Sequence, residues 1–177
     1  MNNFQKCPLK IYIQDIFRAK RSAENKYIYE IFGMNFKNIM IHGVVTSVYN
    51  ITATSSNLEI SDLTGSVQVY FDSSKSNHKI AEGTLKDLRR EYTSASQFGD
   101  INIDIMNTLM SKITDASKRV ITEGSYLSII GDIFVDETKN VRMVSAFECS
   151  ETSEQRDIVW MEELRYLYEK FYLWEKE

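Results

Sequence analysis

The sequence predicts a mainly β protein, a five-stranded barrel with helical additions. Three observations favour this fold: a run of three strand-like segments over residues 36–72, a pair of strands over 126–148, and two helical patterns between them. Half-buried strands alternate apolar and polar side chains, whereas helices repeat apolar residues at spacings of three and four. The 177 residues, 43% of them hydrophobic, are enough for one core with an extension.

The first three strands are predicted from composition and alternation. Residues 38–49 are rich in Ile, Val and Thr and contain Gly43, and a glycine within a strand marks a bulge or a sharp coil of the kind that a small barrel needs. Residues 57–63 alternate, and residues 62–65 (Asp-Leu-Thr-Gly) form a turn. Because successive side chains of a strand point to opposite faces, Val67 and Val69 are expected inside the barrel and Tyr70 outside it.

A helical insertion is expected between the third and fourth strands, over residues 75–122. Its two helices have apolar stripes at three- and four-residue spacing: Ala81, Leu85, Leu88 and Tyr92, then Met106, Leu109, Ile113, Ala116 and Val120. We expect these stripes to be hydrophobic core rather than a cofactor site, with the insertion closing the bottom of the barrel.

Two more strands follow the insertion. Residues 126–135 contain a central glycine, Gly131, and a polar turn joins them to residues 141–148. Three strands, a helical connection and a hairpin are the order of an OB-fold, a five-stranded and partly open barrel. The predicted organisation is therefore an N-terminal arm packing on the barrel (1–35), an OB-fold (36–150) with its enlarged insertion, and a C-terminal interaction helix (151–177).

The N-terminal arm combines apolar and basic residues. Residues 6–26 hold six Lys or Arg against two acidic residues, and Ile11, Ile13, Ile16 and Phe17 are available for docking. The arm is either a basic segment that contacts phosphates or a solvated rim with a few apolar anchors.

The last segment predicts a helix with an aromatic seam. Large apolar residues recur at spacings of four and three and match the residue types that dominate interface energetics. This predicted partner-binding seam consists of Trp160, Met161, Leu164, Leu167, Tyr168, Phe171 and Trp174. The alternative is that the helix folds back on its own barrel.

Several segments together resemble the middle subunit of replication protein A and the Stn-type subunit of the CST complex. The similar segments are residues 8–13, 39–48, the strand and turn of 57–65, 126–134 and 157–174. The resemblance runs from Pro8 to Trp174 apart from the insertion, whose enlarged size is similar to that of insect Stn-like telomere-capping proteins.

The resemblance implies a single-stranded DNA interface. The family stacks a base on an outward aromatic of the third strand, the position of Tyr70, and a second aromatic near the last hairpin matches Phe134. Aromatic rings suit this role because every base has a π-face. Lys75, Lys139 and Arg142 are expected to contact phosphates. The alternative for Tyr70 is packing on the rim of the sheet.

The resemblance also implies partners and a location. The C-terminal helix is expected to bind a small, Ten-type OB-fold subunit, within an assembly of telomere-capping or replication subunits at chromosome ends in the nucleus. Since the net charge is −4, binding to single-stranded DNA by this chain alone is expected to be weak. The alternative function is an assembly-only OB-fold adaptor that binds proteins and no nucleic acid.

No enzyme motif is found in the sequence. It lacks a phosphate-binding glycine loop, a serine elbow, and His or Cys pairs with metal-ligand spacing. Its two cysteines, Cys7 and Cys149, are far apart in the sequence, which suits a reducing compartment. We therefore expect no catalytic residue, metal or cofactor, and the absence of an apolar run near 20 residues predicts no membrane span.

Overall fold

The computed structural model describes residues 4–52, 54–72, 82–116 and 121–173. Its contacts divide the chain into two compact units: residues 1–76 together with 121–177, and residues 77–120. The N-terminal segment and the C-terminal helix thus belong to the same unit as the barrel.

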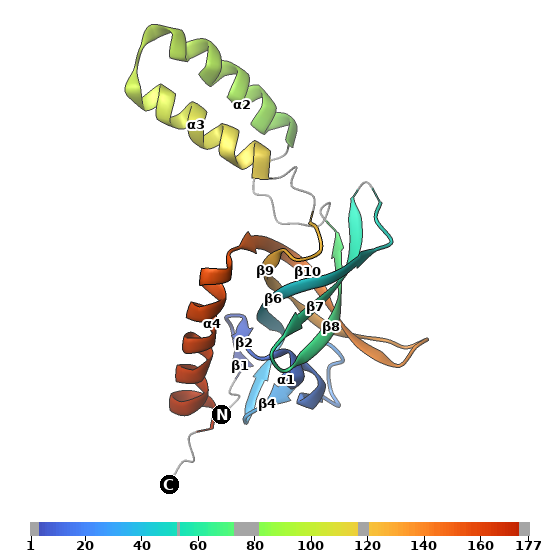
Figure 1. Cartoon of the computed structure of the whole chain (residues 1–177). Helices are drawn as coiled ribbons and strands as arrows, with labels where there is room; N and C mark the ends of the chain where they lie inside the picture. Colours follow the sequence, from blue (N-terminus) through green and yellow to red (C-terminus); the bar gives the residue numbers. More distant parts are fainter. Residues whose placement is uncertain (1–3, 53, 73–81, 117–120, 174–177) are drawn as a thin grey trace. The chain divides into compact units, whose positions relative to one another are not determined.

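Five strands close the barrel (Figure 1). They are β6 (Asn38–Tyr49), β7 (Ser55–Asp62), β8 (Gly65–Asp72), β9 (Tyr126–Asp136) and β10 (Val141–Thr152). Strand β7 pairs antiparallel with β6 and β8, β10 pairs parallel with β8 and antiparallel with β9, and β9 returns to pair with β6. This strand order is that of an OB-fold, so the predicted fold class is confirmed.

The barrel core follows the alternation of the strands. In β8, Val67 and Val69 are buried, and Tyr70 lies on the opposite face and is half-buried. The other four strands contribute buried apolar residues in the same way: Ile39, Ile41, Val45, Leu58, Ile60, Leu127, Ile129, Ile133, Val144 and Ala146.

Two central glycines allow adjacent strands to approach closely. A Cβ atom on Gly43 would lie 2.4 Å from the Ser61 carbonyl oxygen, and one on Gly131 would lie 2.4 Å from that of Ser145. The strand register shifts just after each site. In β6 the shift lies between Val45 and Ser47. In β10 it lies between Ala146, which pairs with Gly131, and Glu148. Glycine is therefore required where the barrel coils most sharply.

Gly131→Ala is expected to lower the free energy of unfolding by about 1–3 kcal/mol, because the new methyl group overlaps backbone atoms that cannot rotate away. Gly83→Ala is the matched control, since no atom lies within 4 Å of its added Cβ and alanine favours the helix by about 0.5–1 kcal/mol. Urea unfolding measures both. Equal stability of Gly131→Ala and wild type would contradict the close approach.

The N-terminal segment forms a small sheet and a helix beside the barrel. Strands β1 (Phe4–Gln5), β3 (Lys20–Arg21), β4 (Tyr29–Ile31) and β5 (Met34–Phe36) pair in the order β1-β5-β4-β3. Strand β2 (Leu9–Lys10) pairs parallel with β6, and helix α1 (Ile13–Arg18) follows it. Ile11, Ile13 and Ile16 are buried in the barrel core, whereas Phe17 is exposed.

The turn between β7 and β8 caps helix α1. Asp62 Oδ2 accepts a hydrogen bond from the Ile13 N–H (2.8 Å), and Thr64 Oγ1 accepts one from the Gln14 N–H (3.1 Å). Asp62 Oδ1 also accepts hydrogen bonds from the N–H groups of Thr64 (2.6 Å) and Gly65 (3.1 Å) within the turn. The first N–H groups of a helix lack intrahelical partners, so this turn attaches the N-terminal segment to the barrel.

The insertion forms a helical hairpin. It consists of α2 (Glu82–Ala95), a short turn η2 (Ser96–Phe98) and α3 (Ile101–Ala116). Leu85 and Met110 are buried in this unit, and Thr93 Oγ1 donates a hydrogen bond to Asn107 Oδ1 (3.0 Å) across the hairpin.

The predicted stripe of α3 is wrong in this hairpin. Met106 and Leu109 are exposed, because two antiparallel helices share one seam and α3 places Met110 there. Ala81 and Val120 lie outside the described residues, as do the side chains of Ile113 and Ala116. The structure describes the insertion as a compact unit by itself, and the helix that packs into the barrel core is α1.

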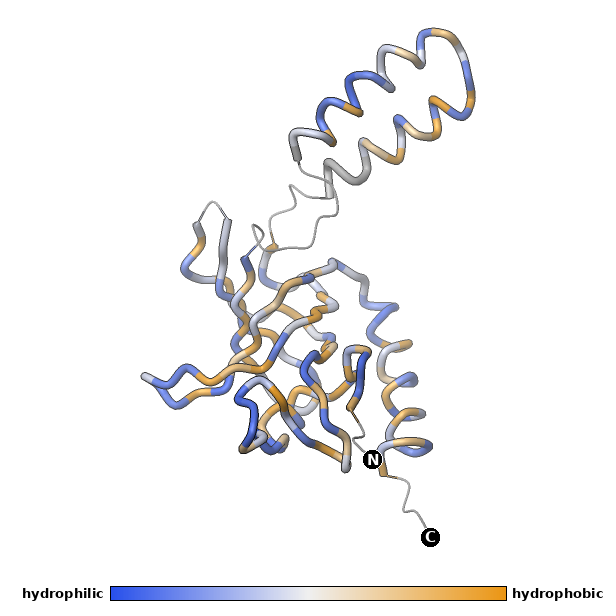
Figure 2. Tube along the Cα trace, turned by 180° about the vertical axis from the view of Figure 1, so that it is seen from behind, coloured by the Kyte–Doolittle hydropathy of each residue, from blue (hydrophilic) through white to orange (hydrophobic). Residues whose placement is uncertain are grey.

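The chain continues with α4 (Glu154–Leu167) and a π-helical turn, η3 (Tyr168–Tyr172). The helix runs alongside the barrel (Figure 1), and Figure 2 shows hydrophobic and hydrophilic residues on successive turns.

Candidate nucleic-acid and partner interfaces

Tyr70 and Phe134 lie on the same outer face of the barrel. Tyr70 pairs with Ser145 of β10, and Met143, the next residue of β10 on that face, is buried and pairs with Phe134 of β9. The intervening residues Val69, Val144 and Ile133 are buried, so they fix which face is inside. The structure thus places two half-buried rings one strand apart on the surface, separated by β10.

This outer face carries an acid and a base of its own. Asp132 lies in the same row as Tyr70 and Ser145, and its Oδ2 is 3.7 Å from Nζ of Lys37. Burial raises the pKa of Asp132, and Lys37 opposes that shift. Glu59 of β7 lies on the same face, in the row of Gln68, Met143 and Phe134. Because the face holds these two carboxylates against Lys37, stacking rather than charge is its main resource for binding. Lys37 was missed by sequence reasoning because it precedes the strand.

Of the three predicted phosphate contacts, the structure exposes one. Lys139 is exposed in the turn between β9 and β10. Lys75 lies outside the described residues.

Arg142 has another role, so its prediction as a phosphate contact is corrected. Its guanidinium Nη1 donates hydrogen bonds to the carbonyl oxygens of Ile16 (2.7 Å), Phe17 (3.0 Å) and Ala19 (2.7 Å). Arg142 lies on the same inner face of β10 as Val144. Its long side chain extends out of the barrel core and places the guanidinium group at the end of α1. The cation therefore satisfies the carbonyls at the C-terminus of α1.

The first half of the predicted partner seam packs on the chain's own barrel. Trp160 is 2% exposed and Leu164 is fully buried. The Trp160 ring lies 5.8 Å from that of His42 in β6, and Nζ of Lys10 lies 5.3 Å from the Trp160 ring centroid. Because both side chains are buried within the chain itself, they are core residues and not partner contacts.

The end of the helix is attached to the N-terminal segment. The Tyr168 hydroxyl donates a hydrogen bond to the buried Asp15 carboxylate, and that of Tyr172 donates one to the Lys10 carbonyl oxygen (3.0 Å). Phe32, in a hairpin turn with positive φ, stacks on Tyr172 at 5.2 Å. Burial raises the pKa of Tyr172 to about 12, so it remains a hydrogen-bond donor at neutral pH.

The π-helical turn changes which residues face outward. The Leu173 N–H donates to the Tyr168 carbonyl oxygen (3.0 Å), five residues back, so one extra residue is accommodated in this turn. Tyr172 faces the barrel unit, and Phe171, on the regular seam, is 61% exposed. Met161 and Leu167 are half-buried, and Trp174 lies outside the described residues.

The exposed face of the helix is apolar in part. We define the free helix face as Ile158, Val159, Tyr166, Phe171 and Leu173, all of which are exposed. Tyr166 also lines a groove of about 320 Å³ between α4 and the N-terminal segment, together with Pro8, Leu9, Leu167 and Tyr172. Phe171 of this face belongs to the predicted partner-binding seam, whereas sequence reasoning missed the other four residues; the signal was the Ile158–Val159 pair outside the seam.

A Ser-His-Asp group lies under α4. His42 Nδ1 is 3.3 Å from Ser128 Oγ, and its Nε2 is 3.4 Å from Asp157 Oδ1. Ser128 and His42 are both buried, beneath the helix that carries Trp160. The group fastens α4 to β6 and β9.

His42 makes stability depend on pH. Burial lowers the pKa of His42, an effect that Arg156 adds to and Asp157 offsets only in part. On acidification, His42 therefore takes up a proton at a higher pH in the unfolded chain than in the folded one. The free energy of unfolding decreases as the pH falls below about 6.5. Thermal unfolding at pH 7.5 and 5.5 is expected to show a smaller decrease for His42→Gln than for wild type. Identical decreases would contradict this assignment.

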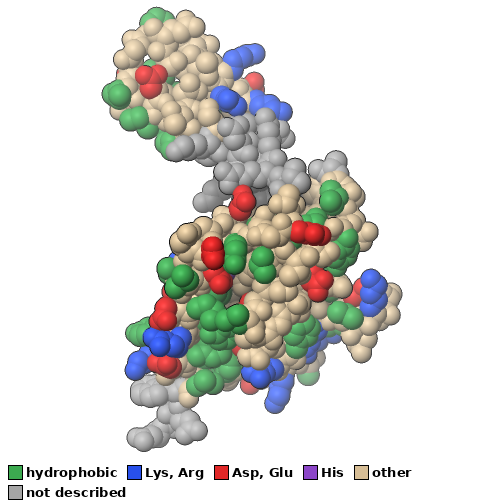
Figure 3. All heavy atoms as spheres, in the orientation of Figure 1, with side chains coloured by type: hydrophobic (Ala, Val, Ile, Leu, Met, Phe, Trp, Pro, Cys, Tyr) green, Lys and Arg blue, Asp and Glu red, His purple; other side chains and the backbone are tan. Residues whose placement is uncertain are grey.

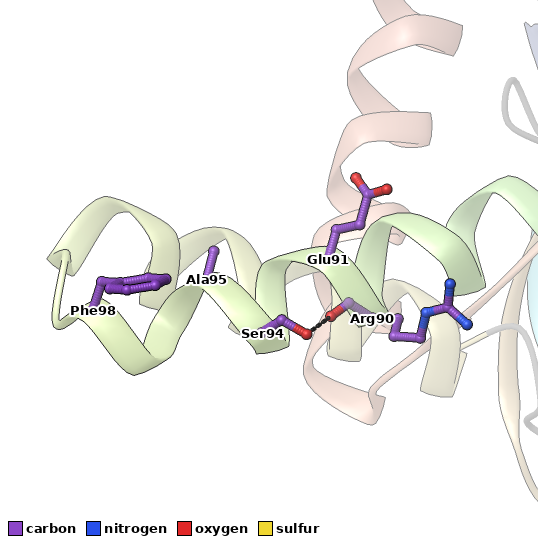
Figure 4. Close-up of a pocket in the computed structure, with 5 residues that line it drawn as sticks. All are labelled: Arg90, Glu91, Ser94, Ala95 and Phe98. Atoms are coloured by element: carbon purple, nitrogen blue, oxygen red, sulfur yellow. Dashed lines mark hydrogen bonds between the residues drawn. The ribbon is translucent and has the colours of Figure 1, made fainter.

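The insertion contains a shallow pocket of about 330 Å³ (Figure 4). The Arg90 and Glu91 side chains that line it point away from each other, and Ser94 Oγ donates to the Arg90 carbonyl oxygen (3.0 Å). Within the described residues no group of His, Cys, Asp and Glu is arranged to hold a metal ion. None of the helices in that part of the chain combines the length and apolar character needed to cross a membrane.

Solved structures share this fold. Aligned over 93% of this chain and 98% of its own length, a chain of the replication protein A heterotrimer bound to single-stranded DNA has a TM-score of 0.59 and 13% identity. The S. pombe Stn1–Ten1 complex has a TM-score of 0.55 and 15% identity, over 93% of both chains. A structure of yeast Stn1 and Ten1 has a TM-score of 0.58 and 11% identity, over 97% of this chain and 78% of that one.

The chain shares the OB-fold of these proteins. The match extends beyond the barrel, since it covers more than nine tenths of this chain in each case. No protein-family model matches the sequence, and no curated protein does.

Proposed function

We propose that this chain is a non-catalytic OB-fold subunit of a complex that binds single-stranded DNA at chromosome ends in the nucleus. The observation that carries the proposal is the common outer face of Tyr70 and Phe134. Two rings on one sheet face provide stacking platforms for successive bases. The structural neighbours support the proposal, because one was solved with single-stranded DNA and two contain Stn1 and Ten1.

The proposed DNA contacts divide into two kinds. Tyr70 and Phe134 stack on bases, and Lys139 on the adjoining hairpin contacts the phosphate backbone. Lys75 is retained as a phosphate contact on sequence grounds. Because the outer face itself holds Glu59 and Asp132 against Lys37, affinity of the isolated chain is expected to be modest.

Fluorescence anisotropy tests this proposal. The purified chain is titrated into a labelled single-stranded oligonucleotide of about 10 nucleotides, at two salt concentrations and against a duplex of the same sequence. We expect preference for the single strand, with weaker binding at higher salt. No binding at either salt concentration, by the chain alone and with its partner subunit, would refute the proposal.

We also propose that a small OB-fold subunit binds the free helix face. Exposed aromatic and aliphatic residues on one helix are the usual anchors of a helical interface. The groove next to Tyr166 continues this surface toward Pro8. This placement differs from the sequence-based one, since Trp160 and Leu164 are buried.

Ile158→Glu combined with Tyr166→Glu is expected to abolish co-elution with the candidate small OB-fold subunit on size exclusion, because charges replace the apolar contacts. The matched control is Ile101→Glu with Ile105→Glu, two exposed apolar residues of α3. A stable complex with the first variant would exclude the free helix face. Partner binding without any DNA binding would instead favour the assembly-only adaptor.

A further inference from the structure

A set of exposed cations and rings lies on the N-terminal segment. Phe17 is 47% exposed and Tyr27 is 52% exposed, so both rings are accessible to a ligand. Four exposed cations accompany them. We define the basic–aromatic edge as Phe17, Arg18, Lys20, Arg21, Lys26 and Tyr27.

The edge is held by hydrogen bonds. The Arg21 Nε–H donates to the Lys26 carbonyl oxygen (3.2 Å), and the Tyr27 N–H donates to Asn25 Oδ1 (3.0 Å). Strand β3 pairs with β4, and Nζ of Lys26 lies 5.1 Å from the Tyr27 ring centroid. The rings and charges are therefore presented on an ordered surface, which limits the entropy lost on binding.

Arg142 connects this edge to the hairpin of the proposed DNA site. It binds the Phe17 carbonyl oxygen (3.0 Å), and its guanidinium carbon lies 5.7 Å from the ring of Tyr29, which pairs with Arg21. The next residue of β10, Met143, pairs with Phe134. Figure 3 shows Lys and Arg side chains both on the edge formed by the N-terminal segment and on the β9–β10 hairpin.

The edge is positive, although the chain is acidic. Its four cations face two exposed carboxylates, Glu24 and Glu30, while Asp15 is buried and bonded to Tyr168. Arg18 lies 3.3 Å from Asp15 and is still 65% exposed at its side chain. Positive charge interleaved with exposed rings is the arrangement that binds a single strand, with cations on phosphates and rings on bases.

We propose that the basic–aromatic edge is a second contact site for single-stranded polynucleotide, which extends the path from the Tyr70–Phe134 face past the β9–β10 hairpin. This inference rests on the proposed function. A strand long enough to reach both sites binds more tightly than one that covers only the Tyr70–Phe134 face.

The test compares oligonucleotides of about 8 and about 20 nucleotides by fluorescence anisotropy. For wild type we expect the longer strand to bind at least about tenfold more tightly. Phe17→Ala with Tyr27→Ala is expected to remove this gain and leave binding of the short strand unchanged. A second pair, Lys20→Gln with Lys26→Gln, is expected to reduce the slope of log affinity against log salt for the long strand by about 1.4.

The controls separate the two claims. Arg165→Gln with Lys170→Gln removes the same charge from α4 and is expected to leave the length dependence intact. If Tyr70→Ala with Phe134→Ala leaves short-strand binding unchanged, the proposed function fails. If that variant weakens short-strand binding but the edge variants keep the wild-type gain for the long strand, only the second site is overturned. Repeating the series with ribonucleotide strands decides between DNA and RNA as the ligand.

Discussion

Tyr70→Ala combined with Phe134→Ala is expected to weaken single-stranded DNA binding by roughly 2–6 kcal/mol, because stacking on one aromatic ring contributes about 1–3 kcal/mol per base. Both rings are half-buried on the outer face, and the residues that point inward beside them form the core. Anisotropy with a short labelled oligonucleotide measures the change.

The matched control for this variant is Phe98→Ala with Tyr166→Ala, two exposed rings on α2–α3 and α4. It is expected to bind DNA as wild type does, and thermal unfolding checks that both variants are folded. Wild-type affinity of the Tyr70 and Phe134 variant, in a folded protein, would mean that these rings pack on the sheet and bind no base.

Trp160→Ala is expected to lower the free energy of unfolding by about 3–5 kcal/mol, since a large buried ring is removed and a cavity remains. The indole lies against His42 and under the Lys10 ammonium group, so its loss also loosens α4 from the barrel. Ile158→Ala, an exposed position on the same helix, is expected to change stability by less than about 0.5 kcal/mol. Urea unfolding distinguishes them.

If Trp160→Ala were as stable as wild type, α4 would not be docked on β6 in solution, and the original seam would again be available to a partner. Leu164 supports the same reasoning, because it is fully buried beside the barrel. A charged residue at Leu164 therefore tests folding and not partner binding. This is why the partner test uses Ile158 and Tyr166.

The barrel was predictable from the sequence because alternation is a local property. Strand β6 occupies the predicted range, and Val69 and Tyr70 lie on the predicted faces. The role of the two strand glycines was also predictable, since Gly43 and Gly131 lie where a neighbouring backbone leaves no room for a Cβ atom. These features depend on residues that are adjacent in one strand or in two paired strands.

The helix and the cations were less predictable, because their contacts join distant parts of the chain. A seam at three- and four-residue spacing is the same whether it meets a partner or the chain's own barrel, and Trp160 meets β6. The π-helical turn begins at Tyr168, whose hydroxyl group bonds to Asp15 near the N-terminus, more than 150 residues away in sequence. Arg142 binds carbonyls more than 120 residues away in sequence, which no local pattern indicates.

Photocrosslinking tests the central claim most directly. A single-stranded oligonucleotide that carries 5-bromodeoxyuridine is irradiated with the chain, and the crosslinked peptides are identified by mass spectrometry. The account predicts crosslinks in β8 around Tyr70 and in the β9–β10 hairpin around Phe134. Crosslinks confined to α4 or to the α2–α3 hairpin would show that the outer face of the barrel does not bind the strand.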